Sequence, residues 1–165
     1  MKRLSILFAA TLLLAGCGSA PQPEATATAS PVTLTQWIKD AGFTTVLSGL
    51  AAAVTEISDA MSAAGTDTVK MAKALRPNGE KVAALADQLA AEPASADAGY
   101  EKLRNELVIA MRAYASAASS IELTSGATQL AGVTDAFGAL TALSQAITLL
   151  SAYLSAHGSD ETTAK

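Results

Sequence analysis

The chain has 165 residues, a net charge of −4, and an apolar fraction of 50% against an aromatic fraction of only 4%. This length allows one domain with a single hydrophobic core. An acidic chain without clustered lysine or arginine offers no surface that neutralises phosphates, so we expect no nucleic-acid partner. Cys17 is the only cysteine, which excludes a disulfide within the chain.

The first 17 residues have the pattern of an export signal. Residues 1–3 (MKR) are positively charged, and the apolar run at 4–14 is short for a transmembrane helix, which needs about 20 apolar residues. Residues 14–17 (LAGC) resemble the lipobox of bacterial lipoproteins. The resemblance implies that residues 1–16 are a signal peptide, that cleavage falls between Gly16 and Cys17, and that Cys17 is lipidated. An ordinary secretory signal with an incidental cysteine is the alternative interpretation.

The resemblance also predicts where the protein is held. Lipoproteins of this type carry two or three acyl chains such as palmitate, and each buried methylene contributes about 0.8 kcal/mol. We therefore expect an exported protein anchored to the outer face of the cell membrane or to the outer membrane. Loss of Lys2 and Arg3 lowers the 11 basic side chains to 9 against 15 acidic ones. Attachment to the membrane thus depends on the lipid.

Residues 17–32 are expected to form the lipidated cysteine and a disordered tether. Residues 18–32 (GSAPQPEATATASPV) contain three prolines and no apolar periodicity. Their reach is about 20 Å as a coil and about 50 Å when straight. A plain spacer is the preferred interpretation, although the composition also resembles that of O-glycosylated linkers.

A helical domain is predicted at residues 33–158, and its first helix starts near Thr33. Thr33 and Gln36 have capping-box spacing, and Gly65 is placed to end the helix in a left-handed conformation. Trp37 and Ile38 either cap the bundle end nearest the tether or form an exposed contact patch. The apolar stripe of the helix has heptad spacing: Phe43, Leu47, Leu50, Val54, Ile57, Met61 and Ala64.

The remaining helices are expected at 66–91, at 95 to about 123, and from 127 to near His157, followed by a polar tail at 159–165. Pro77 removes a helix hydrogen bond, so the second helix is expected to break or to kink sharply there. Short connections make neighbouring helices antiparallel. The predicted fold class is all-α: an antiparallel up-down-up-down four-helix bundle with its second helix broken near Pro77. The apolar stripe expected for the last helix is Leu130, Val133, Phe137, Leu140, Ser144, Ile147, Ser151 and Leu154.

The last predicted helix is unusual because no Asp, Glu, Lys or Arg occurs between Asp135 and Asp160. The preferred interpretation is a central helix buried on most of its circumference. A flank that forms a homo-oligomer or partner interface is the second interpretation. A membrane-inserting segment with paired small residues such as Gly132 and Ala136 is the third, and its hydroxyl residues argue against it.

Candidates for catalysis and metal binding are few. His157 is the only histidine and stands at a helix end, where a favourable interaction with the helix dipole is the simpler explanation. Glu56 and Asp59 share a helix face that we expect to be solvated. Tyr100 and Tyr114 belong either to the core or to a small ligand cavity, and core packing is preferred. We therefore expect no enzyme activity, no cofactor and no metal.

These observations favour a noncatalytic, lipid-anchored envelope protein that acts as a protein-interaction module. Its expected partner is an envelope protein or a protein arriving from outside, and a homo-oligomer is a further expectation. The exclusion of a second phage infection, as by proteins of phage or prophage origin, is a specific form of this hypothesis. The alternative is a carrier that holds a small apolar ligand within the helical bundle.

Overall fold

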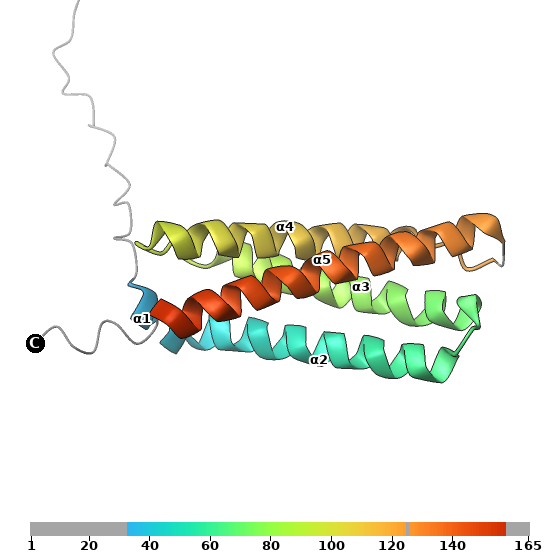
Figure 1. Cartoon of the computed structure of the whole chain (residues 1–165), viewed down its shortest axis with the longest axis horizontal. Helices are drawn as coiled ribbons and strands as arrows, with labels where there is room; N and C mark the ends of the chain where they lie inside the picture. The colour runs from blue at the N-terminus through green and yellow to red at the C-terminus, as the bar shows by residue number, and fades with distance from the viewer. Residues whose placement is uncertain (1–32, 125, 158–165) are drawn as a thin grey trace, which may run out of the picture.

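The computed structural model describes residues 33–124 and 126–157, without the side chains of Thr35, Trp37, Ile38 and Ala41. The predicted antiparallel four-helix bundle is confirmed: the four long helices alternate in direction along the bundle (Figure 1). The predicted signal peptide, tether and polar tail lie outside the described residues. The helices are α1 (Leu34–Lys39), α2 (Ala41–Ala64), α3 (Thr68–Ala91), α4 (Ala98–Ser120) and α5 (Ala127–His157).

The first helical region begins as predicted but is divided in two. Thr33 N–H donates to Gln36 Oε1 at 3.1 Å, and Gln36 N–H donates to Thr33 Oγ1 at 3.4 Å, which confirms the capping box. The expectation of one helix up to Gly65 is wrong because Asp40 starts a new one. Asp40 has an extended backbone (φ −67°, ψ 129°), and its carboxylate accepts the Gly42 N–H at 2.6 Å.

The next two helices also begin at an aspartate. The Asp67 carboxylate accepts the N–H groups of Val69 and Lys70, and the Asp97 carboxylate accepts the N–H of Tyr100. Gly65 ends α2 with a positive φ of 57°, and its N–H donates to the Met61 carbonyl at 3.1 Å. Only glycine adopts this backbone region without steric cost, so the predicted position of the helix end is confirmed. Its ψ of −113° differs from the left-handed helical conformation that was expected.

The predicted break at Pro77 is wrong, because α3 is continuous from Thr68 to Ala91 and contains the proline. Pro77 has no N–H for the carbonyl of Lys73, but both residues are exposed, so water can bind that carbonyl. The next turn of α3 is held by its neighbours. Asn78 Nδ2 donates to the Ala53 carbonyl of α2 at 3.0 Å, and Gly79 lies against Ala115 and Ala118 of α4. These contacts offset the lost helix hydrogen bond.

The core lies between the four long helices. Between α2, α3 and α4 it contains a chain of buried hydrogen bonds. Tyr114 of α4 donates its hydroxyl to Asn78 Oδ1 at 3.1 Å, and Asn78 in turn donates to α2. A Cβ on Gly79 would lie 2.8 Å from the Ala118 Cβ and 3.2 Å from the Ala115 carbonyl oxygen. The absence of a side chain at Gly79 therefore permits the close approach of α3 and α4.

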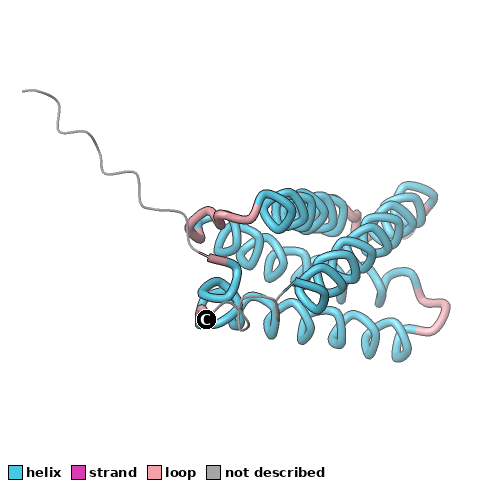
Figure 2. The backbone as a smooth tube through the Cα atoms, turned by 60° about the vertical axis from the view of Figure 1, so that its left-hand side comes forward, coloured by secondary structure: helices cyan, strands magenta, loops and turns pink. Residues whose placement is uncertain are grey.

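Helix α5 crosses the other long helices obliquely, from the end of α4 toward the start of α2 (Figures 1 and 2). It packs closely on α4 and also reaches α3, whereas α2 packs mainly on α3. The α2–α5 edge is thus the loosely packed edge of the bundle. Figure 2 shows α5 standing clear of α2 where α5 begins.

Candidate functional site

The residues predicted to anchor the protein are not tested by the structure. Gly16 and Cys17 lie outside the described residues. Trp37 and Ile38 belong to α1, at the end of the bundle where α2 begins (Figure 1), and their side chains are outside the description. The contact patch at these two residues therefore stays a prediction.

The acidic pair of α2 lies on a solvated face. Lys81 Nζ lies 2.6 Å from Glu56 Oε2, and both side chains are more than half exposed. Asp59 is also exposed. Within residues 33–124 and 126–157, no three His, Cys, Asp or Glu side chains come together as metal ligands would.

The two candidate tyrosines, Tyr100 and Tyr114 of α4, are fully buried. The ring of Tyr100 meets the edge of Phe43 at a centroid distance of 6.1 Å and an interplanar angle of 78°. Burial raises the pKa of Tyr114 to about 12, and burial likewise raises the pKa of Tyr100. Both rings fill the core, as the preferred interpretation expected.

A polar cluster that sequence reasoning missed ties the end of α5 to the start of α4. Tyr153 donates its hydroxyl to Asp97 Oδ1 at 2.8 Å. The ring of His157 stacks on the ring of Tyr153 at a centroid distance of 4.2 Å. The Tyr100 N–H, and then the Tyr153 hydroxyl, hold the pKa of Asp97 below its usual value. The hydrogen bond from the Tyr153 hydroxyl to Asp97 raises the pKa of Tyr153. No sequence signal links residues 97 and 153, which meet only through the packing of the helices.

The expectation that α5 is buried on most of its circumference is wrong. Among the described helices, α5 is long and apolar enough, by length and composition, to cross a membrane. Only 11% of its most apolar stretch is buried within the chain. The reason is its position: α4 and α3 cover one side and leave the other exposed. The buried line includes Ala136, Leu143 and Leu150, whereas Ser144 and Ser151 of the predicted stripe are exposed.

Charged side chains are concentrated away from this exposed side. Asp135 is the only Asp, Glu, Lys or Arg in α5, and α2 carries Glu56 and Asp59 alone. Residues 41–55 of α2 and 136–156 of α5 therefore form two uncharged segments. The charged side chains of the other two long helices include Lys70, Lys73, Arg76, Glu80, Lys81, Asp87, Glu101, Lys102, Arg104, Glu106 and Arg112.

The two uncharged segments meet at an apolar groove, which we call the α2–α5 groove. It has a volume of about 370 Å³ and lies near the bundle end where α2 begins and α5 ends (Figure 1). Leu50 forms its floor and is 2% exposed, whereas Leu47 and Val54 are half-buried. The groove is lined by Leu47, Leu50, Ala51, Val54, Ile147 and Ser151.

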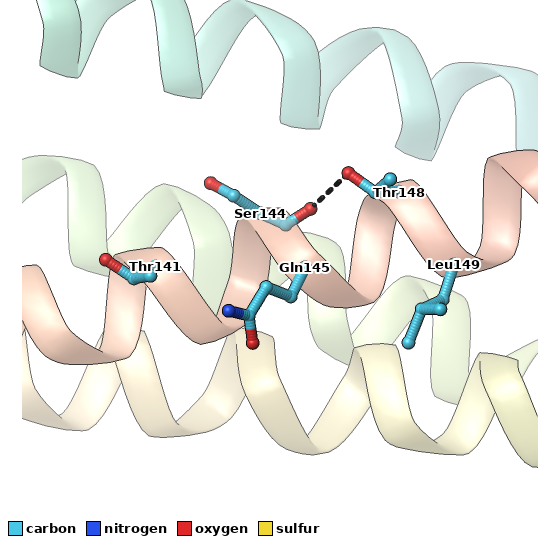
Figure 3. A pocket seen from close by; sticks show the side chains of 5 residues that line it. All are labelled: Thr141, Ser144, Gln145, Thr148 and Leu149. Atoms are coloured by element: carbon cyan, nitrogen blue, oxygen red, sulfur yellow. Dashed lines mark hydrogen bonds between the residues drawn. The ribbon is translucent and has the colours of Figure 1, made fainter.

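Elsewhere on its exposed surface, α5 carries large apolar side chains and scattered hydroxyls. Leu130 is 54% exposed and Leu149 is 55% exposed. Figure 3 shows Thr148 on the flank of α5 nearer α2, and Gln145 and Leu149 on the flank nearer α4. A shallow hollow of about 450 Å³ is lined by Thr141, Ser144, Gln145, Thr148 and Leu149.

Five hydroxyl groups of α5 donate within the helix. Thr141 donates to the Phe137 carbonyl at 3.0 Å, and Thr148 donates to the Ser144 carbonyl at 2.9 Å (Figure 3). Thr134, Ser144 and Ser155 do the same toward the residue four positions earlier. Because each of these donors has a partner, an apolar surface can cover the hydroxyls without leaving their donors unsatisfied. The outer face is therefore suited to a dry contact.

Comparisons of the chain with protein-family models, with curated protein sequences and with solved structures find no match. The fold and this surface define an all-α bundle with one uncharged, partly open side.

Proposed function

We propose that this chain is a noncatalytic, lipid-anchored protein of the cell envelope that binds a protein partner through α2 and α5. The observation that carries the proposal is the exposed side of residues 136–156 of α5, which contain no Asp, Glu, Lys or Arg. On this side Thr141, Ser144 and Thr148 donate their hydroxyls within the helix. An apolar helix is normally covered on most sides by protein or lipid. In this chain α4 and α3 cover one side of α5. A partner bound to the other side would account for the apolar, uncharged composition of α5.

The proposed anchor supports this choice of surface. The LAGC sequence predicts a lipid on Cys17, and residues 18–32 would link that lipid to Thr33. Thr33 precedes α1 at the bundle end where α2 begins and α5 ends (Figure 1). With a tether that spans about 50 Å when straight, the α2–α5 groove would face partners held at the same membrane.

Replacement of the cysteine tests the anchor. The Cys17→Ala chain is expected to lose incorporation of an alkyne-labelled palmitate and to leave the membrane fraction, because the thioether cannot form. Ser19→Ala, two residues away, serves as the control and is expected to keep both properties. Equal membrane association of the Cys17→Ala and wild-type chains would show that the lipid anchor is wrong.

Site-specific photo-cross-linking in intact cells tests the interaction surface. A photoreactive amino acid at Thr148 is expected to capture a protein, whereas the same amino acid at Lys73 on the charged α3 is expected to capture little. Equal capture at the two positions would contradict a specific surface on α5.

Phage plating on cells that express the chain tests the narrower proposal of infection exclusion, which predicts fewer plaques.

Carriage of a small apolar ligand is the second candidate function, and the α2–α5 groove favours it. A volume of about 370 Å³ lies within the range of small-molecule sites, and Leu47, Leu50 and Ile147 provide an apolar lining. Native mass spectrometry of the gently extracted protein separates the two functions. Carriage predicts an additional small mass on the chain, and the interaction module predicts a co-purifying protein without that mass.

A further inference from the structure

We infer that the occupant of the α2–α5 groove is a second copy of this chain, which inserts its own α5 beside α2. The inference deepens the proposed function by naming the partner. The relative orientation of the two copies rests on the proposed lipid anchor, whereas the contact itself does not.

The groove is an incomplete helix-packing site. In a closed up-down-up-down bundle, the first and last long helices pack against each other. Here α5 leans toward α4, and Leu47 and Val54 of α2 stay half-buried beside the groove. A further uncharged helix laid against Leu47 and Val54 would supply the packing that α2 does not receive from its own α5.

The shape of this side is self-complementary. Helix α5 is the ridge directly beside the groove, because its Ile147 and Ser151 form one wall. A two-fold axis parallel to the bundle would place the ridge of each copy in the groove of the other, which is an isologous contact. The partner's α5 would then run antiparallel to α2, as neighbouring helices do within the bundle.

Charge favours this side for contact between identical chains. Each copy has a net charge of −4, so two copies repel each other over most approaches. Residues 41–55 of α2 and 136–156 of α5 carry no charge, so no like charges meet where these segments face each other. An acidic or basic partner would find no complementary charge on the same segments.

The proposed anchor makes the parallel arrangement geometrically consistent. With the two-fold axis along the bundle, Thr33 of both copies lies at the same end, so both tethers reach one membrane. Confinement to a membrane also raises the effective concentration of each copy for the other. An antiparallel pair would place one of the two anchors at the far end of the bundle, about 45 Å away for a helix of 31 residues.

Oxidative cross-linking of the full-length chain in membranes tests the inference. Thr148→Cys is expected to yield a covalent dimer as the main species, whereas Lys73→Cys, on the exposed charged face of α3, is expected to stay monomeric. Thr148→Lys is expected to abolish dimerisation in native mass spectrometry with an unchanged helical circular dichroism spectrum. Ala90→Lys, on the exposed side of α3, is the matched control and is expected to keep the dimer.

Three outcomes would overturn the inference. They are equal cross-linking of the two cysteine variants, a Thr148→Cys product that contains a different protein, and a monomer that carries a small apolar molecule. The Cys17→Ala chain separates the two proposals. Dimer formation by this chain can be measured in the membrane fraction or in the soluble fraction, wherever the chain is found. A dimer that forms despite a failed anchor contradicts the proposed function and supports the contact.

Discussion

Arg104 of α4 joins this helix to the end of α3. Its buried guanidinium donates to the Leu89 carbonyl at 3.2 Å, to the Glu92 carbonyl at 3.0 Å, and to Glu101 Oε2 at 2.8 Å. The two carbonyls belong to the end of α3, where backbone acceptors lack helical partners. Arg104 therefore caps α3 from the neighbouring helix and pairs with a carboxylate on its own.

Replacement of this arginine is expected to destabilise the fold strongly. Arg104→Ala removes the side-chain donor to the Leu89 and Glu92 carbonyls and the cation beside Glu101, which is expected to cost about 3 kcal/mol of unfolding free energy. Glu101 keeps the Ser95 N–H as a donor to its Oε1. Arg112→Ala is the matched control, because Arg112 pairs with Asp87 at 2.9 Å on the exposed surface. Its expected cost is about 0–1 kcal/mol. Urea unfolding followed by circular dichroism measures both, and equal costs would contradict the capping role.

Tyr114 is expected to make the fold sensitive to alkaline pH. Burial raises its pKa to about 12 in the folded chain, against a usual value of 10.0. The stabilisation by the neutral hydroxyl is complete below pH 10 and is lost as the pH rises toward about 12. Tyr114→Phe removes this titration and the bond to Asn78, so its stability is expected to be lower at pH 7 and to fall less between pH 10 and 12. A pH dependence identical to that of the wild type would contradict this assignment.

At the scale of the helices, local signals predicted the ends better than the interiors. The Thr33–Gln36 box and Gly65 act through atoms close in sequence, so their spacing was sufficient to predict them. Asp40 acts locally too, but the apolar heptads that continue through α2 concealed its role as a cap. The continuity of α3 through Pro77 depends on Asn78 and Gly79 contacting α2 and α4, which local propensity does not include.

Pro77 provides a test of how tertiary contacts maintain a helix. Pro77→Ala restores the N–H that can donate to the Lys73 carbonyl, so it is expected to raise stability by about 1–3 kcal/mol. Gly79→Ala, two residues later, is expected to destabilise by about 1–3 kcal/mol because its Cβ would crowd Ala115 and Ala118. Thermal unfolding measures both variants. Destabilisation by Pro77→Ala would show that α4 packs on a helix shape that requires the proline.

For the whole molecule, the sequence predicted the number and the directions of the long helices but not the side that stays open. The predicted stripe of α2 located its buried face only in part. Leu50 and Ile57 of the stripe are buried, but Leu47 and Val54 are half-buried. Val46 and Ala53, which lie outside the stripe, are buried instead. Helix α5 has apolar residues all round, and its buried face is decided by contact with α4. The α2–α5 groove could not be predicted, because it depends on the oblique crossing of α5 (Figures 1 and 2).

Two adjacent leucines test which face of α5 is open. Leu150 is 1% exposed and Leu149 is 55% exposed. Leu150→Ala is expected to cost about 2–5 kcal/mol of unfolding free energy, because it leaves a cavity in the core. Leu149→Ala is expected to stay within about 0.5 kcal/mol in the monomer. Similar costs for both in a dilute, monomeric sample would show that α5 is rotated from the orientation described.

The attachment of α5 at both ends determines how this helix can respond to a load. Near its start, Gln129 accepts a hydrogen bond from Thr68 of α3 at 3.0 Å, and near its finish Tyr153 holds Asp97 of α4. Between these two bonds, Ala136, Leu143 and Leu150 of α5 are buried in the core, so the helix is held along its length. Force on α5 from a neighbouring molecule would therefore pass to α3 and α4 along this whole contact rather than at one end.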